Sequence, residues 1–142
     1  MSVVNRTFPA IPDSIRDWTR FLSSLFFARS FECSLIGCTT TPTATARYTA
    51  SAGIVCLSIP DLSATSNSVN TFLAGLPADI TPQHDQPCIA RIIDNGVTAA
   101  GIAIVGLDGS MTLTKDLSGT SGTFTAAGTK GIRFSNVVYP LD

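Results

Sequence analysis

The chain of 142 residues carries little charge: Asp, Glu, Lys and Arg together make up 13% of it, about half of the ~25% usual for a soluble domain. Lysine occurs only at Lys115 and Lys130, and the formal net charge is −1. Proteins that bind nucleic acid irrespective of its sequence, or the surface of an anionic membrane, need a surplus of positive charge. We therefore expect neither partner. With so few charges, hydroxyl groups and backbone keep the surface soluble, or partners cover much of it.

Long apolar runs and a targeting signal are missing as well. The longest apolar clusters, such as residues 25–28, are far shorter than the ~20 residues of a membrane-spanning helix. Residues 1–12 do not show the basic-then-apolar order of a signal peptide. These features predict a protein that is made in a cytoplasm and does not insert into a membrane.

Side chains for catalysis are few. His84 is the only histidine, so it is the only candidate for imidazole chemistry, and it lies in a proline-flanked loop where we expect it to be exposed. Glu32 is the only glutamate, and most aspartates stand at predicted turns, where their own backbone hydrogen bonds explain them. A distant pair of carboxylates for glycoside cleavage remains open, but no spacing supports it. The sequence predicts no enzyme, no metal and no cofactor.

Four cysteines are present, at positions 33, 38, 56 and 88. The spacing of Cys33 and Cys38 does not match a zinc knuckle, and no histidine lies near them. Cys56 and Cys88 fall within apolar, strand-like runs, where a thiol behaves as a small apolar side chain. Buried free thiols are the favoured prediction, and at least one disulfide is the alternative.

The first 30 residues differ from the rest of the chain. Residues 1–12 contain two prolines and are expected to form an extended arm. A short α-helix is predicted over residues 13–28, with apolar positions that follow the 4, 3, 4, 3 spacing of a heptad seam. These positions are Ile15, Trp18, Leu22 and Leu25, and Ile11 precedes them at the same spacing. The helix either packs on its own domain or attaches the protein to a larger structure, because isolated helices of this length are marginal.

Residues 31–142 show alternating or short apolar runs separated by turns about every ten residues. Strands are predicted at 31–35, 46–50, 54–59, 69–73, 88–93, 97–105, 110–115, 123–127 and 132–139. Asn95-Gly96 is a strong signal for a hairpin turn, because both residues tolerate positive φ. The expected fold is mainly β, a jelly-roll-like β-sandwich preceded by the arm and the short helix.

Two of these runs, residues 88–93 and 97–105, are apolar on both faces. A strand that is half exposed to water normally alternates apolar and polar residues. Two-sided apolarity therefore suggests that another subunit covers the outer face. The candidate interface residues are Ile89, Ile93, Ile102 and Ile104.

A series of short motifs runs in order along residues 45–142. It comprises Arg47-Tyr48, Gly53 before the run 54–60, the segments 72–78 and 80–82, Asp94-Asn95-Gly96, Asp108-Gly109, the segments 123–126 and 128–131, and Tyr139-Pro140. In order and spacing this series resembles the C-terminal knob domains of tailed-bacteriophage fibre proteins and related virion decoration proteins. The resemblance implies a homotrimer of jelly rolls of the tumour-necrosis-factor type. It also implies that the first segment anchors the protein to the virion.

The sequence therefore predicts a non-enzymatic virion protein with two parts: an anchor of residues 1–30 and a knob of residues 31–142. The anchor would bind capsid or tail proteins through the apolar seam of the helix. A carbohydrate-binding module that recognises a host-surface glycan is the alternative. A small glycan depolymerase is less favoured, because no cluster of carboxylates is visible.

Overall fold

The computed structural model describes residues 28–120 and 123–142, and the predicted helix lies almost wholly outside them. Strands make up 57% of the described residues, and these include no α-helix, so the mainly β prediction is confirmed. The ten strands are β1 (Arg29–Ile36), β2 (Thr43–Ser51), β3 (Ile54–Ile59), β4 (Leu62–Thr65), β5 (Thr71–Ala74), β6 (Gln86–Asp94), β7 (Val97–Val105), β8 (Ser110–Thr114), β9 (Thr129–Ile132) and β10 (Ser135–Pro140). A short 3-10 helix, η1 (Ala78–Ile80), precedes β6.

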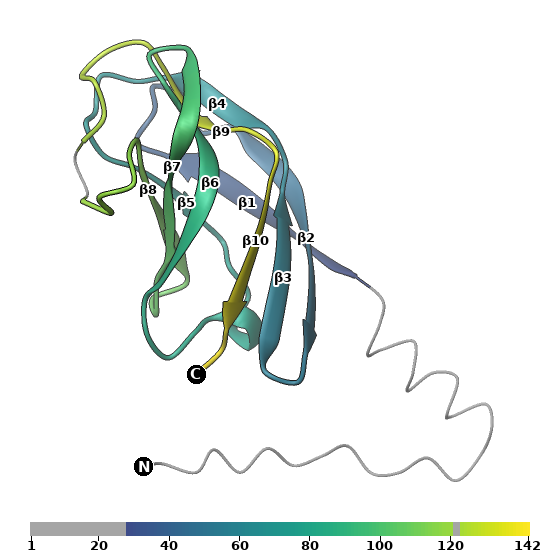
Figure 1. Ribbon diagram of the computed structural model, residues 1–142. Coiled ribbons are helices and arrows are strands. Elements are labelled where there is room, and N and C mark those ends of the chain that lie inside the picture. The colour runs from purple at the N-terminus through teal and green to yellow at the C-terminus, as the bar shows by residue number, and fades with distance from the viewer. Residues whose placement is uncertain (1–27, 121–122) are drawn as a thin grey trace, which may run out of the picture.

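All ten strands belong to one antiparallel sheet in the order β10-β3-β2-β1-β5-β8-β7-β6-β9-β4. The sheet curls until β10, at one end of this order, lies beside β6 (Figure 1). The Arg91 N–H donates to Ser135 Oγ of β10 at 3.0 Å, and just before β10 the Arg133 N–H donates to the Arg91 carbonyl at 2.8 Å. This closure encloses the core and brings residues from both halves of the chain together on the outside.

Strand periodicity explains which side chains form the core. In β3, Val55, Leu57 and Ile59 alternate with outward residues and are at most 1% exposed, as their shared face in the sequence predicts. The inner faces of the other strands contribute mainly Leu, Ile, Val, Met and Tyr. Burial of these side chains stabilises the subunit by about 1.5–3 kcal/mol each.

One end of the core is filled by the short helix η1. Its Ile80 is fully buried, and the Ile80 carbonyl accepts a hydrogen bond of 2.8 Å from the Tyr139 hydroxyl. The Tyr48 hydroxyl donates to Asp79 Oδ2 at 2.9 Å. Two buried tyrosines from distant strands therefore hold η1 in place.

The predicted hairpin over residues 94–96 is present, and Asn95 and Gly96 have φ angles of 48° and 79°. Other expectations were wrong. Residues 62–65, which lie between the predicted strands 54–59 and 69–73, form β4: Leu62 is buried, and all four residues pair with β9. Residues 123–127 form no strand, since Thr125 N–H and Oγ1 bind the Asp94 carboxylate at 3.0 and 2.8 Å instead of a neighbouring strand.

The last predicted strand, residues 132–139, is two strands that meet different partners. Ile132 ends β9, which pairs with β4 and β6, whereas β10 begins at Ser135 and pairs with β3. Arg133 and Phe134 connect them. The break places Ile132 in the core and leaves Phe134 54% exposed, so these two residues do not share a face.

Candidate functional site

An apolar row of side chains crosses the outside of the sheet over β6, β7, β8, β5 and β1. Strand register places Ile89 opposite Ile102, and Pro87 opposite Ile104. From Ile104 the row continues through Thr112, Phe72 and Ile36. We call these seven residues the outer apolar face. None of the seven carries a charge.

Three of the four interface candidates from the sequence lie together on this face. Ile89 is 69% exposed, and Ile102 and Ile104 are half-buried. Ile93 is only 2% exposed but does not belong to the core cluster that contains Ile92, so it is covered in the isolated subunit and the outer apolar face does not include it. The five anchor candidates Ile11, Ile15, Trp18, Leu22 and Leu25 lie outside the described residues.

Next to the outer apolar face, an open hollow of about 590 Å³ lies between the β6–β7 hairpin and the start of β10. Its lining combines apolar surface from Ile89, Ala100 and Phe134 with four polar side chains, those of Arg91, Thr98, Ser135 and Asn136. A concave, largely apolar surface with a few polar groups is typical of ligand-binding sites. Ile89 therefore borders both the outer apolar face and the hollow.

Polar side chains form a second row across β2, β3 and β10, ending at the hollow. Register places Arg47 beside Ser58, and Ser58 beside Asn136. Ser58 Oγ and Asn136 Oδ1 are 2.6 Å apart, so the serine hydroxyl donates to the amide oxygen. Among the described residues nothing accepts a hydrogen bond from Asn136 Nδ2. This amide group is therefore available to a ligand.

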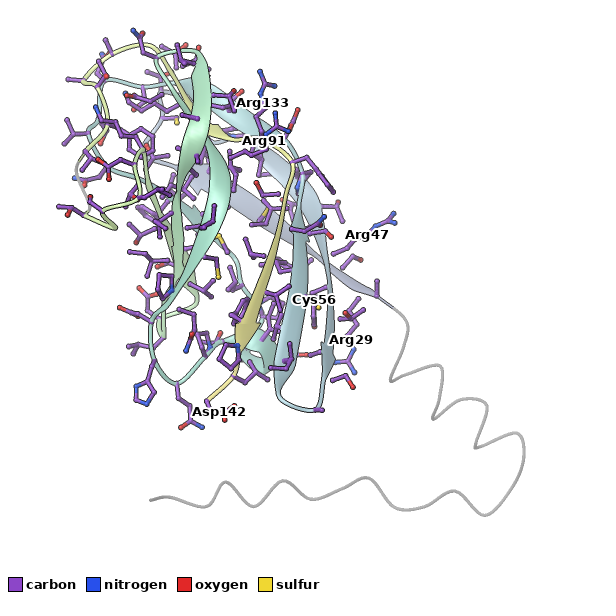
Figure 2. All side chains as sticks on the ribbon, in the orientation of Figure 1. Arg29, Arg47, Cys56, Arg91, Arg133 and Asp142 are labelled. Atoms are coloured by element: carbon purple, nitrogen blue, oxygen red, sulfur yellow. The ribbon has the colours of Figure 1, made fainter. Side chains whose placement is uncertain are left out.

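Four arginines follow the same side of the subunit in Figure 2: Arg29, Arg47, Arg91 and Arg133. Arg29 pairs with Asp79 at 2.9 Å, and Arg133 pairs with Asp61 at 3.3 Å. Within residues 28–120 and 123–142, neither Arg47 nor Arg91 forms an ion pair with a carboxylate. The exposed side chain of Arg91 lines the hollow, whereas its backbone is held by β10.

Asp61 fixes the loop that carries Phe134. Its Oδ1 accepts a hydrogen bond of 2.5 Å from the Phe134 N–H. This bond is the main reason why the pKa of Asp61 is lowered, and the nearby guanidinium groups of Arg133 and Arg91 add to the effect. Asp61 therefore stays charged at neutral pH and holds the exposed phenyl ring at the rim of the hollow. The exposure of Phe134 could not be predicted from the sequence, because it depends on the break between β9 and β10.

A buried cation lies elsewhere in the subunit. Lys130 is fully buried, and its Nζ donates to the Ser66 carbonyl at 2.7 Å and to the Ala127 carbonyl at 3.5 Å. Burial of a charge costs free energy unless hydrogen bonds compensate for it. These bonds tie β9 to the loop after β4, so we assign Lys130 a structural role.

The groups considered for catalysis are dispersed. His84 is exposed, as expected for a loop residue. No group of three or more His, Cys, Asp and Glu side chains suited to a metal ion occurs in the described part of the chain. The four cysteines are unpaired in the structure. Cys88 is buried as predicted, but the prediction for Cys56 was wrong: it is exposed, because it lies on the face of β3 opposite to Val55 and Leu57.

Comparison of the chain with protein-family models and with curated proteins found no match. Among the described residues, no helix has the length and apolar character needed to cross a membrane.

Proposed function

We propose that this protein is a non-enzymatic bacteriophage virion protein whose β domain forms a trimeric knob. The observation that carries the proposal is the outer apolar face, on which Ile89 is 69% exposed beside Ile102 and Ile104. The resemblance of residues 45–142 to phage fibre knobs supports the same assignment. In this proposal the curled sheet is one subunit of a jelly-roll-like assembly around a three-fold axis.

Contact with a second copy of the chain would remove the outer apolar face from water. Permanent interfaces between subunits are large and apolar, and charged residues are depleted at their centres. The face spans five strands without a charged side chain. Contact between copies would also account for the low overall charge of 13%, because less surface needs to be kept soluble.

Attachment to the particle is assigned to residues 1–30. The helix seam of Ile11, Ile15, Trp18, Leu22 and Leu25 would bind a capsid or tail protein, as in a decoration protein, a head fibre or a short tail fibre. Trp18 is the expected anchor, because buried aromatic residues dominate the energetics of interfaces.

The test uses full-length protein and particles that lack it. Trp18→Ala should weaken attachment by on the order of 2–4 kcal/mol, which is roughly a 30- to 1,000-fold loss of affinity. Arg16→Ala, outside the seam, is the matched control. Occupancy of the particles is measured by quantitative gel densitometry after sedimentation. Normal occupancy of the Trp18→Ala protein would assign attachment to the knob instead.

Recognition of a host-surface glycan is the second candidate function, and a specific observation favours it. Phe134 and Arg91 meet at the open hollow beside β10, where an exposed aromatic ring and a free guanidinium are within reach of one ligand.

A further inference from the structure

We propose that the hollow between the β6–β7 hairpin and β10 binds a saccharide that carries a carboxylate. The proposal deepens the glycan-recognition role named above. It depends only on residues within one subunit, so it does not require the trimer. Three features carry it: the shape of the hollow, the exposed ring of Phe134, and arginine charge that no carboxylate of the described chain neutralises.

The shape and the apolar lining suit a small number of sugar rings. A volume of about 590 Å³ falls within the range of roughly 300–1,000 Å³ found for small-molecule sites. Phe134 is 54% exposed in the lining of the hollow. The apolar face of a sugar ring can pack against its phenyl ring, which would remove apolar surface of both partners from water.

The acidic group of the ligand is assigned to Arg91. Guanidinium groups bind carboxylates through two parallel hydrogen bonds, and these charge-assisted bonds are about twice as strong as neutral ones. The charge of Arg91 helps to lower the pKa of Asp61, but the Asp61 carboxylate already binds Arg133 at 3.3 Å and the Phe134 N–H at 2.5 Å. The positive charges of Arg47, Arg91 and Arg133 therefore outnumber the single negative charge of Asp61, so the surface beside the hollow is net positive.

Hydroxyl groups of the same ligand would form hydrogen bonds with the polar side chains on β2, β3 and β10, which are Arg47, Ser58 and Asn136. Ser58 donates to Asn136 Oδ1, so Asn136 presents its Nδ2 donors at the hollow. Neighbouring strands lie about 4.8 Å apart, which places the backbone of Arg47 about 10 Å from that of Asn136 across β3. A second acidic residue of an oligosaccharide could therefore reach Arg47. This arrangement favours an acidic oligosaccharide over a neutral one.

The proposal is tested with the full-length protein and trigalacturonic acid, a carboxylated probe, in isothermal titration calorimetry. The methyl-esterified trisaccharide is the matched neutral probe. We expect binding of the acid, at least a ten-fold preference over the ester, and weakening of the acid complex by salt. Equal affinity for the two probes, or no binding of the acid at millimolar concentration, would overturn the proposal.

Variants locate the site. Arg91→Gln should reduce affinity for the acid at least ten-fold, and we expect it to keep the fold because the hydrogen bonds of Arg91 with Ser135 and Arg133 use its backbone. Arg91→Lys should recover only part of the loss, since an ammonium cannot form the two parallel bonds. Phe134→Ala should reduce the affinity for the acid and the affinity for the ester by the same factor. Arg29→Gln removes one charge outside the hollow and is the control; if it weakened binding as much as Arg91→Gln, binding would reflect net charge alone.

Failure of this proposal can be distinguished from failure of the proposed function. Light scattering on the same samples reports the oligomeric state. A trimer that does not bind the acid leaves the virion-knob proposal intact and removes the sugar site. A monomer that binds the acid removes the trimer and retains the site.

Discussion

Truncation of Ile89 tests whether the outer apolar face joins subunits. Ile89 is 69% exposed in the subunit, and full burial of an isoleucine side chain is worth about 1.5–3 kcal/mol. Covering the exposed two-thirds should therefore stabilise each contact by about 1–2 kcal/mol. Three copies contribute in a trimer, so the assembly gains on the order of 3–6 kcal/mol from this position.

Ile89→Ala removes most of this contribution but keeps Cβ. The expected loss in the free energy of trimer association is therefore the lower value, about 3 kcal/mol. We expect the association constant of the trimer to fall by at least about 100-fold, at ~1.4 kcal/mol per factor of ten. Sedimentation equilibrium over a dilution series measures this constant. Ile54→Ala is the control, because Ile54 is also exposed, at 45%, but lies on β3 away from the outer apolar face. If the two variants weakened the trimer equally, or neither did, the assignment of this face would be refuted.

Three further predictions concern the fold that presents both surfaces. Tyr139→Phe removes the buried hydrogen bond to the Ile80 carbonyl, so the free energy of unfolding should fall by about 1–3 kcal/mol; an unchanged denaturant midpoint would contradict this. Burial raises the pKa of the Cys33 and Cys88 thiols above that of a free thiol, so the folded state holds these protons more tightly; the thiol contribution to stability is constant below pH ~8.5, and the melting temperature should fall as the pH rises above that value. Replacing both cysteines with alanine should flatten that fall, and an equally steep fall would assign it to other groups. Gly131→Ala should destabilise the subunit by at least ~2 kcal/mol, because a Cβ there would overlap the backbone of β4; a melting temperature within a degree of the parent would contradict the packing of β9 on β4.

Features set by local sequence were predictable. The hairpin at residues 94–96 follows from the positive φ that Asn95 and Gly96 tolerate. The strand Val97–Val105 and the inward positions Val55, Leu57 and Ile59 follow from apolar runs and period-two alternation. The same alternation places Cys56 outside, on the face opposite to Val55 and Leu57; the prediction that it is buried came from the apolar character of the run alone.

Features set by distant parts of the chain were not predictable. Leu62 becomes part of an edge strand only because β9 pairs with it, and residues near Thr125 lose their strand because Asp94 binds that backbone. The hollow depends on closure of β10 against β6, which joins residues more than forty positions apart. Phe134 could have been noted as an aromatic residue beside charged Arg133, but no local pattern indicates that its ring is exposed.

The mass of the full-length protein in solution tests the central claim most directly. Size-exclusion chromatography with light scattering is run at micromolar concentration, where a permanent assembly stays intact. The trimer predicts a single species of about 45 kDa, three times the chain mass of 14.9 kDa. A monodisperse species of 14.9 kDa would contradict the claim, because the outer apolar face would then be exposed to water in the functional protein.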